Sequence, residues 1–282
     1  MIARRFKPVV AALAAALALT LAGCGGSSEP NANPSVVPGA TPGGTLRIGI
    51  SFDQPGLGMK DGNTYSGFDV DTATYVAKAL GVSPDKITWI EADPANRESL
   101  LSSGAVDLVF STYSITDERK KVVDFAGPYF LAHQDLLVRR NEDQISGPET
   151  LDNRVLCSVA GTTSAALVKE RFKGRIQLRE YAKFSDCVAA LDRSEVDAVT
   201  TDDVILAGFA AEPQYKGKLR VVGKGFSDEY YGVGIKKGDT ARVEQVNAAL
   251  KEYVADGSWK ASLNRTVRPS GYKLPDPPSV GS

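Results

Sequence analysis

Histidine, methionine and cysteine are scarce in this chain, whose 282 residues hold one His, two Met and three Cys. The single imidazole, His133, leaves histidine-based metal sites and Ser-His-Asp triads without their parts. It borders an apolar run, so we interpret it as a packed structural residue rather than a catalyst. Basic charge is not in excess, because 33 Lys and Arg are set against 34 Asp and Glu. We therefore expect no metal, no cofactor and no nucleic-acid partner.

Long apolar runs are also missing, and no stretch is long enough for a confident membrane span. Val9 to Ala22 follows three basic residues and is typical of a secretory signal peptide. At its end lies Leu21-Ala22-Gly23-Cys24, which overlaps this segment and resembles a bacterial lipobox. The resemblance implies a signal peptide of residues 1–23 and a lipid on the sulfur of Cys24; the alternative is ordinary secretion with Cys24 unpaired. Residues 24–43, rich in Gly, Ser, Pro and Asn, are expected to form a flexible tether.

Two cysteines remain, Cys157 and Cys187, separated by 187 - 157 = 30 positions. Export to an oxidising compartment favours a disulfide between them. Closing a loop of that length is worth roughly 3 kcal/mol in unfolded-chain entropy. The alternative is a pair of buried free thiols.

Apolar segments of strand length alternate with segments of helical period along the rest of the chain, which predicts an α/β fold. Ligands of such sheets bind beyond the carboxyl ends of the strands, where the loops at Ser51 and Ser111 fall. The Pro-rich segment from Lys273 to Ser282 is expected to be a frayed tail. Expected strands are 46–50, 87–90, 106–110, 155–158, 176–181, 196–200, 219–222 and 231–235, and expected helices are 70–80, 97–102, 165–172, 184–191, 204–211 and 242–255.

The segment from Phe110 to Tyr129 carries the strongest functional pattern. A buried strand leads into several hydroxyl residues, and Thr116 is placed to cap a helix N-terminus. Arg119 follows within the first turn, where a guanidinium opposes the helix dipole. A ligand carboxylate, gripped by two parallel hydrogen bonds, would explain that position. The alternative is a surface Arg paired with Asp117 or Asp124.

Two motifs resemble the family 3 extracellular solute-binding proteins, the polar amino-acid receptors of ABC importers. The first runs from Thr112 to Tyr129; the second is Gly67-Phe68-Asp69-Val70-Asp71, which departs from the family at Thr72. The resemblance covers Thr45 to Lys273. It implies a two-lobed, type II periplasmic-binding-protein fold, each lobe a mixed sheet flanked by helices. Lobe one would comprise residues 44–132 and 234–272, lobe two residues 133–233, and the hinge strands residues 134–139 and 231–236.

The resemblance also implies a carboxylate site. Arg119 would bind the ligand's α-carboxylate with Ser114 and the backbone N–H of Thr162. Thr162 lies in the turn Gly161-Thr162-Thr163-Ser164, between a strand and a helix N-terminus, which is suited to an anion. The alternative for this turn is a plain connection between strand and helix.

The ligand ammonium would be bound by Asp202, after the strand 196–200, and by the Thr112 carbonyl. Adjacent residues of a strand point to opposite faces, so its neighbour Asp203 is interpreted as the N-cap of the following helix. The two aspartates could have exchanged roles.

For the side-chain pocket, Arg97 matches an arginine of family members that bind glutamate or aspartate; the alternative is a surface Arg at a helix start. Gln54 and Phe52 could add an amide and an apolar wall. Gln54 stands where glutamine-binding members carry a stacking aromatic, and Val159 where they carry a lysine. We expect glutamate or aspartate as ligand, followed by asparagine or glutamine.

The function implied is that of a monomeric, lipid-anchored receptor on the extracytoplasmic face of the membrane. It would deliver an amino acid to an ABC permease by closing its cleft, without turning it over. One alternative is a periplasmic enzyme of dehydratase type, with Asp202 or Glu118 as general acid. Another is a ligand-sensing receptor that passes its closed state to a signalling partner.

Overall fold

The computed structural model describes residues 44–281, and the predicted signal peptide, tether and lipidated Cys24 lie outside them. Within that range, no helix is both long and apolar enough to cross a membrane. The strands are β1 Leu46–Ile50, β2 Asp53–Gln54, β3 Gly58–Asp61, β4 Thr64–Ser66, β5 Ile87–Glu91, β6 Leu108–Phe110, β7 Val123–Arg139, β8 Val155–Val159, β9 Gln177–Tyr181, β10 Ala198–Asp202, β11 Leu219–Val221 and β12 Asp228–Lys236. The helices are α1 Phe68–Ala79, α2 Arg97–Ser102, α3 Asp117–Lys120, α4 Thr163–Arg171, α5 Phe184–Asp192, α6 Asp203–Ala211, α7 Thr240–Ala255 and α8 Ser258–Thr266, with single 3-10 turns at Pro84–Lys86, Pro148–Thr150 and Arg268–Ser270.

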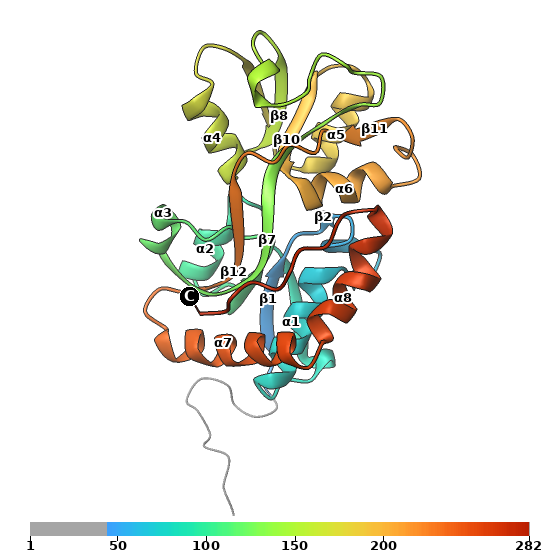
Figure 1. Ribbon diagram of the computed structural model, residues 1–282. Coiled ribbons are helices and arrows are strands. Elements are labelled where there is room, and N and C mark those ends of the chain that lie inside the picture. The colour runs from blue at the N-terminus through green and yellow to red at the C-terminus, as the bar shows by residue number, and fades with distance from the viewer. Residues whose placement is uncertain (1–43, 282) are drawn as a thin grey trace, which may run out of the picture. The chain divides into compact units, whose positions relative to one another are not determined.

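Lobe one, the lower part of Figure 1, is built on β1. This strand pairs in parallel with β5 on one side and β6 on the other, and Ile48 and Ile50 are fully buried. Helix α1 buries Ala73, Val76 and Ala77, whose spacing places them on one face. Gly67 precedes the helix at φ 120°, and a Cβ there would lie 2.1 Å from the Leu57 carbonyl oxygen, so the motif begins with a residue that has no side chain.

Lobe two repeats the arrangement around β8. It pairs in parallel with β9 and β10, and helices α4, α5 and α6 pack against this part of the sheet. Both lobes therefore present the carboxyl ends of parallel strands, and the loops that follow β1, β6, β8 and β10 meet between the lobes.

The lobes share strand β7, whose residues run without interruption from one to the other (Figure 1). Its first part pairs with β12 in lobe one and its last part with β10 and β11 in lobe two. Of the expected hinge strands, 134–139 thus lies in the lobe-two sheet and 231–236 in the lobe-one sheet. The chain crosses between lobes around His133, which pairs with Asp228. The chain therefore passes from one part of the sheet to the other near His133 of β7 and Asp228 of β12.

Three segments differ from expectation. The segment that begins at Ser51, expected to be a loop, contributes β2 to a small antiparallel sheet with β3 and β4. Helix α8 was not expected. The C-terminal segment is not frayed, because Leu274 and Val280 pack against the core and the Gly281 N–H donates to the Gly127 carbonyl at 2.8 Å.

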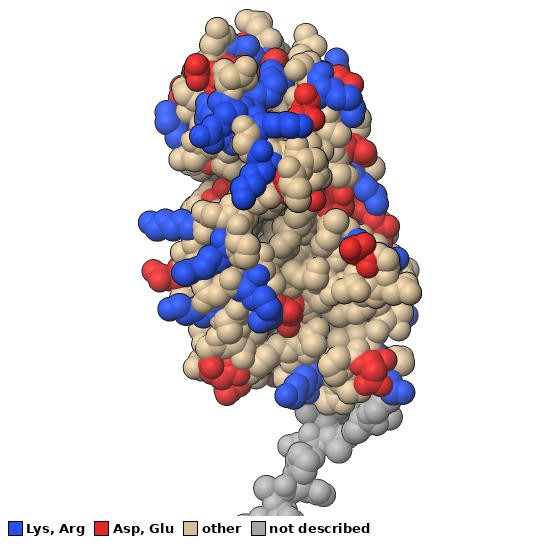
Figure 2. All heavy atoms as spheres, turned by 90° about the vertical axis from the view of Figure 1, so that its right-hand side faces the viewer, with Lys and Arg blue, Asp and Glu red and all other residues tan. Residues whose placement is uncertain are grey.

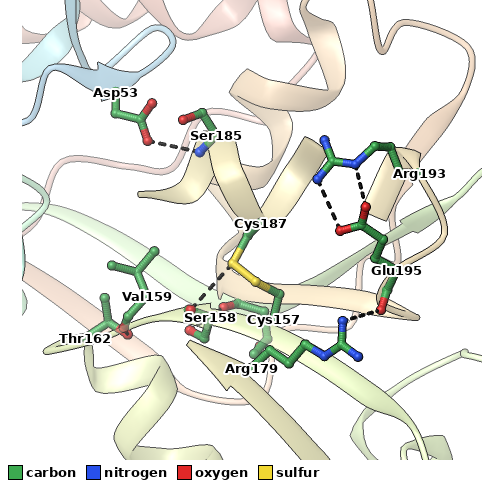
Figure 3. The surroundings of a disulfide bond; sticks show 11 residues. Asp53, Cys157, Ser158, Val159, Thr162, Arg179, Ser185, Cys187, Arg193 and Glu195 are labelled. Carbon is green, nitrogen blue, oxygen red and sulfur yellow. Dashed lines mark hydrogen bonds and ion pairs between the residues drawn. A yellow bond between two sulfur atoms is a disulfide. The ribbon is translucent and has the colours of Figure 1, made fainter. Parts of the chain in front are cut away.

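The expected disulfide is present. Cys157 in β8 and Cys187 in α5 are bonded, with Cα atoms 5.5 Å apart, and both are fully buried (Figure 3). The bond fixes the first half of α5 to β8, the middle one of the three parallel strands of lobe two.

Candidate functional site

A small polar cavity lies between the lobes at the carboxyl ends of their strands. Seven of the eight expected ligand-binding residues line it, and the exception is Phe52. The lining residues are Gln54, Pro94, Arg97, Thr112, Ser114, Arg119, Thr162, Thr163, Ser164, Phe184, Thr201, Asp202 and Ile205.

Arg119 spans the two lobes. Thr116 caps α3 as expected, its side chain accepting the Arg119 N–H at 3.2 Å. The guanidinium donates to the Ser114 carbonyl at 2.8 Å and to the Gly161 carbonyl of lobe two at 3.0 Å. The side chain is only 10% exposed, and its nearest carboxylate is Glu98, at 3.6 Å from Nε. The alternative of a surface Arg paired with Asp117 or Asp124 is therefore wrong.

Arg97 is buried too, at 2% exposure, so the surface alternative is also wrong for this residue. It donates to the Ser111 carbonyl at 2.8 Å and its Nε has no hydrogen-bond partner. Both guanidinium groups lie over the ring of Tyr113. The ring centroid is 4.1 Å from the guanidinium carbon of Arg97 and 5.0 Å from that of Arg119. Burial, and then repulsion from Arg119, lowers the pKa of Arg97 to about 10.

Asp202 is the buried acid of the cavity, at 4% exposure. Its Oδ2 accepts a hydrogen bond from the Tyr231 hydroxyl at 2.5 Å, whereas Oδ1 has no partner. Burial raises the pKa of Asp202 well above its ordinary value, and the nearby Glu229 carboxylate raises it further. A cation placed against Oδ1 would compensate this charge.

Asp203 points the other way. Its Oδ1 accepts from the His133 N–H at 3.1 Å and from the Tyr272 hydroxyl at 3.0 Å, outside the cavity. The two neighbouring carboxylates thus face opposite sides, as expected. The expected cap is shifted by one residue, because Asp202 occupies the N-cap position and Asp203 begins α6.

Thr112 is held in an unusual backbone conformation at the edge of the cavity, with φ at 42°. Its N–H donates to Asp69 Oδ2 at 2.9 Å, and the Tyr129 hydroxyl donates to Asp69 Oδ1 at 2.8 Å. The side chains of Gln54 and Thr112 are also hydrogen bonded, at 3.1 Å. Asp69 therefore positions the loop without lining the cavity, and burial raises its pKa to about 6.

Two expected residues are placed less favourably. The Thr162 N–H donates within its own turn, to the Val159 carbonyl at 3.3 Å, while its hydroxyl oxygen caps α4 by accepting from the Ala165 N–H at 3.0 Å. Phe52 lies outside the cavity and packs against Tyr65, with ring centroids 5.4 Å apart.

The family of bacterial extracellular solute-binding proteins, family 3, matches residues 46–267 of the chain. The chain belongs to this family. Glutamate-binding protein GluB of Corynebacterium glutamicum is 42% identical to this family member, over 95% of this chain and 93% of that protein. The ABC transporter glutamine-binding protein GlnH of Bacillus subtilis is 33% identical, over 78% and 80%. An ancestral arginine-binding protein bound to arginine aligns with a TM-score of 0.74 at 33% identity, over 80% of this chain and 99% of that one.

The family fold is thus the type II, two-lobed one expected from the motifs. Tyr231, Tyr113 and Asp69 support the residues that line this member's cavity and were not predicted from the sequence. Tyr231 carries no local signal, because its partner Asp202 is 29 positions away. Asp69 did carry one, since it is a carboxylate on the apolar face of a helix within the family motif. In the described range, no three His, Cys, Asp or Glu side chains gather as ligands for a metal ion.

Proposed function

We propose that the protein captures a free amino acid with an acidic side chain, glutamate or aspartate, and less readily glutamine or asparagine. The observation that carries this is the charge of the cavity: two guanidinium groups and one carboxylate, of which Arg97 and Asp202 are buried and Arg119 has a side chain 10% exposed. A dicarboxylic amino acid carries the complementary set of two carboxylates and one ammonium. Buried charges need such partners, because each unpaired one costs several kcal/mol.

Each ligand group has a partner in this proposal. The α-carboxylate binds Arg119, whose guanidinium also donates to the Ser114 carbonyl at the cavity wall. The ammonium binds Asp202 at the unpaired Oδ1, and the side-chain carboxylate binds Arg97, whose Nε is unpaired. The similarity to a glutamate-binding protein over nearly the whole chain supports the same choice.

Capture proceeds by closure. Arg97 and Arg119 belong to lobe one and Asp202 to lobe two, so a ligand bound first by the arginines meets the aspartate only when the lobes approach. The ligand favours the closed state by its higher affinity for that state. The closed lobes are then presented to an ABC permease. We further propose that a lipid on Cys24 anchors the monomer at the extracytoplasmic face of the membrane.

A dehydratase is the second candidate, because the raised pKa of Asp202 favours a protonated acid in the cavity. Incubation with prephenate or arogenate and chromatography of the products tests it. Product formed by wild type and lost in Asp202→Asn supports the enzyme. Unchanged substrate over a day supports the receptor.

The deciding experiment is calorimetric titration of refolded, ligand-free protein with glutamate, aspartate, glutamine and asparagine. We expect dissociation constants in the micromolar range or below for the acids. Arg119→Ala and Asp202→Asn should each weaken binding of every ligand by at least about 100-fold, as truncating one partner of a buried charge pair does. Arg119→Lys keeps the charge but not the two-pronged geometry and should recover part of the affinity. Absence of heat with all four ligands, or full affinity in Arg119→Ala, would refute the proposal.

A further inference from the structure

A second set of contacts joins the lobes away from the cavity. Asp53 of β2, in lobe one, accepts the Ser185 N–H at 3.0 Å through Oδ2 (Figure 3). Ser185 lies in the first turn of α5, whose free N–H groups and dipole favour a carboxylate. Beside it, Lys183 Nζ and Glu91 Oε1 are 2.6 Å apart. The disulfide at Cys187, two residues further on, fixes this turn to β8.

Helix α6 touches the same lobe-one loop at Gly208. A Cβ built on Gly208 would lie 2.3 Å from the carbonyl oxygen of Pro55, a distance that real Cβ atoms do not reach. Gly208 has ordinary helical geometry, so its own backbone would accept a side chain and alanine would be the better helix former. The close approach of the lobe-one backbone therefore explains why position 208 is a glycine, whereas the helix conformation does not require one.

We infer that Asp53 and Gly208 are positioning residues that set how far the lobes close, and hence how tightly the ligand is held. The inference rests on the proposed function, since it concerns closure over that ligand. Neither residue lines the ligand cavity. Asp53 attracts the N-terminus of α5, and Gly208 permits α6 to reach the backbone of Pro55. With a methyl group at position 208, the helix would have to withdraw by about 1 Å to reach an ordinary contact distance, and the closed state would become less populated.

Two variants test this, each with a matched control. Gly208→Ala adds one carbon toward lobe one, and its control Ala207→Ser adds one oxygen on the same helix toward a separate cavity that His133 also lines. Asp53→Asn removes the charge that faces α5, and its control Asp61→Asn removes an exposed charge from the same small sheet. Calorimetry gives the affinity, thermal unfolding without ligand gives the stability, and small-angle scattering with and without ligand gives the extent of closure.

We expect Gly208→Ala to raise the dissociation constant at least about tenfold, while its unfolding temperature without ligand stays equal or rises. Asp53→Asn should raise the constant about three- to tenfold, and both controls should stay within about twofold. With saturating ligand, Gly208→Ala should keep a larger radius of gyration than wild type.

Wild-type affinity in both variants would overturn the inference. So would a Gly208→Ala protein less stable than wild type without ligand, because α6 and Pro55 would then meet in the open state as well. If wild type binds no amino acid, the proposed function fails separately. The inference, which concerns closure over that ligand, then has no state to act on and fails as well; a wild type that binds while both variants keep its affinity ends the inference alone.

Discussion

The guanidinium of Arg97 should cost the empty protein stability. Burial and the neighbouring Arg119 lower its pKa from 12.5 to about 10. At about 1.4 kcal/mol per unit, holding this charge in the ligand-free closed site costs about 3 kcal/mol relative to the unfolded chain. A lowered pKa of a cation penalises folding at every pH below the folded value, so the penalty is fully present at pH 7 and fades only above about pH 10. Arg97→Met, which has similar length and no charge, removes it.

We therefore expect opposite effects of Arg97→Met on stability and on binding. Removing the charge should raise the free energy of unfolding without ligand by up to about 3 kcal/mol. Loss of the hydrogen bond to the Ser111 carbonyl should lower it by about 1–2 kcal/mol, so the net rise is smaller. Affinity for glutamate should fall by about 2–4 kcal/mol, or roughly 30- to 1,000-fold, because its side-chain carboxylate loses a buried partner. Affinity for glutamine should fall less than about tenfold.

Urea unfolding of ligand-stripped protein and calorimetry with both ligands measure these quantities. Arg97→Lys is the control, since it keeps a cation in the same place and should gain no comparable stability. Equal losses of glutamate and glutamine affinity would refute the assignment of Arg97 to the ligand side chain. A lower stability of Arg97→Met, with unchanged binding, would assign Arg97 to the fold alone.

Two further predictions concern stability. Asp69 has a folded pKa of about 6 against an ordinary 3.8, so its ionised form is disfavoured in the fold, and unfolding free energy should rise by up to about 3 kcal/mol as pH falls from 7 to 4. Urea unfolding at both pH values should show this rise in wild type and its absence in Asp69→Asn; the same rise in the variant would assign it to other groups. Replacing Cys157 and Cys187 by Ser should lower the unfolding free energy by about 3–4 kcal/mol, because a loop of 30 residues is no longer closed in the unfolded chain. Reduction of wild type should reproduce the loss, and a stable reduced protein would contradict it.

The alternation of strands and helices was predictable from the sequence because it depends on local period. Thr116 as a helix cap followed in the same way, from a hydroxyl residue before acidic ones. Helix α8 also has a local signal, with Trp259, Leu263 and Val267 spaced by four residues and buried, but it begins directly after the left-handed Gly257, where the helical pattern of α7 had ended.

The point at which the chain crosses between the lobes was not predictable in this way. It depends on which partner each half of β7 pairs with, and pairing is a property of distant segments. The same holds for Tyr231, which reaches Asp202 from another strand, and for Tyr113, whose ring is covered by both arginines. Resemblance to a family indicated the charged residues that line the cavity, but their supporting contacts depend on how distant segments pack.

Charges on the protein surface do not explain the proposed ligand preference as the buried charges do. In Figure 2 basic side chains gather over the upper lobe, with acidic ones among them, and the surface is hollowed between the lobes. Exposed charges are screened by water and salt and interact weakly, whereas the charges of Arg97 and Asp202 are almost fully buried. Affinity should therefore depend on the buried set.

The burial that destabilises the closed state without ligand also explains how a ligand favours closure. With the cleft open, water can solvate Arg119 of lobe one and Asp202 of lobe two; with it closed and empty, they lose that solvation and only part of it is replaced by hydrogen bonds. A ligand that carries the opposite charges compensates most of the lost solvation energy. Its binding to the closed form is therefore more favourable than its binding to the open form by that compensated energy. A neutral analogue of similar size fills the space but recovers less of that energy. Closure is thus driven by charge complementarity more than by contact area, and a receptor of this design rejects ligands that fit its volume but not its charges.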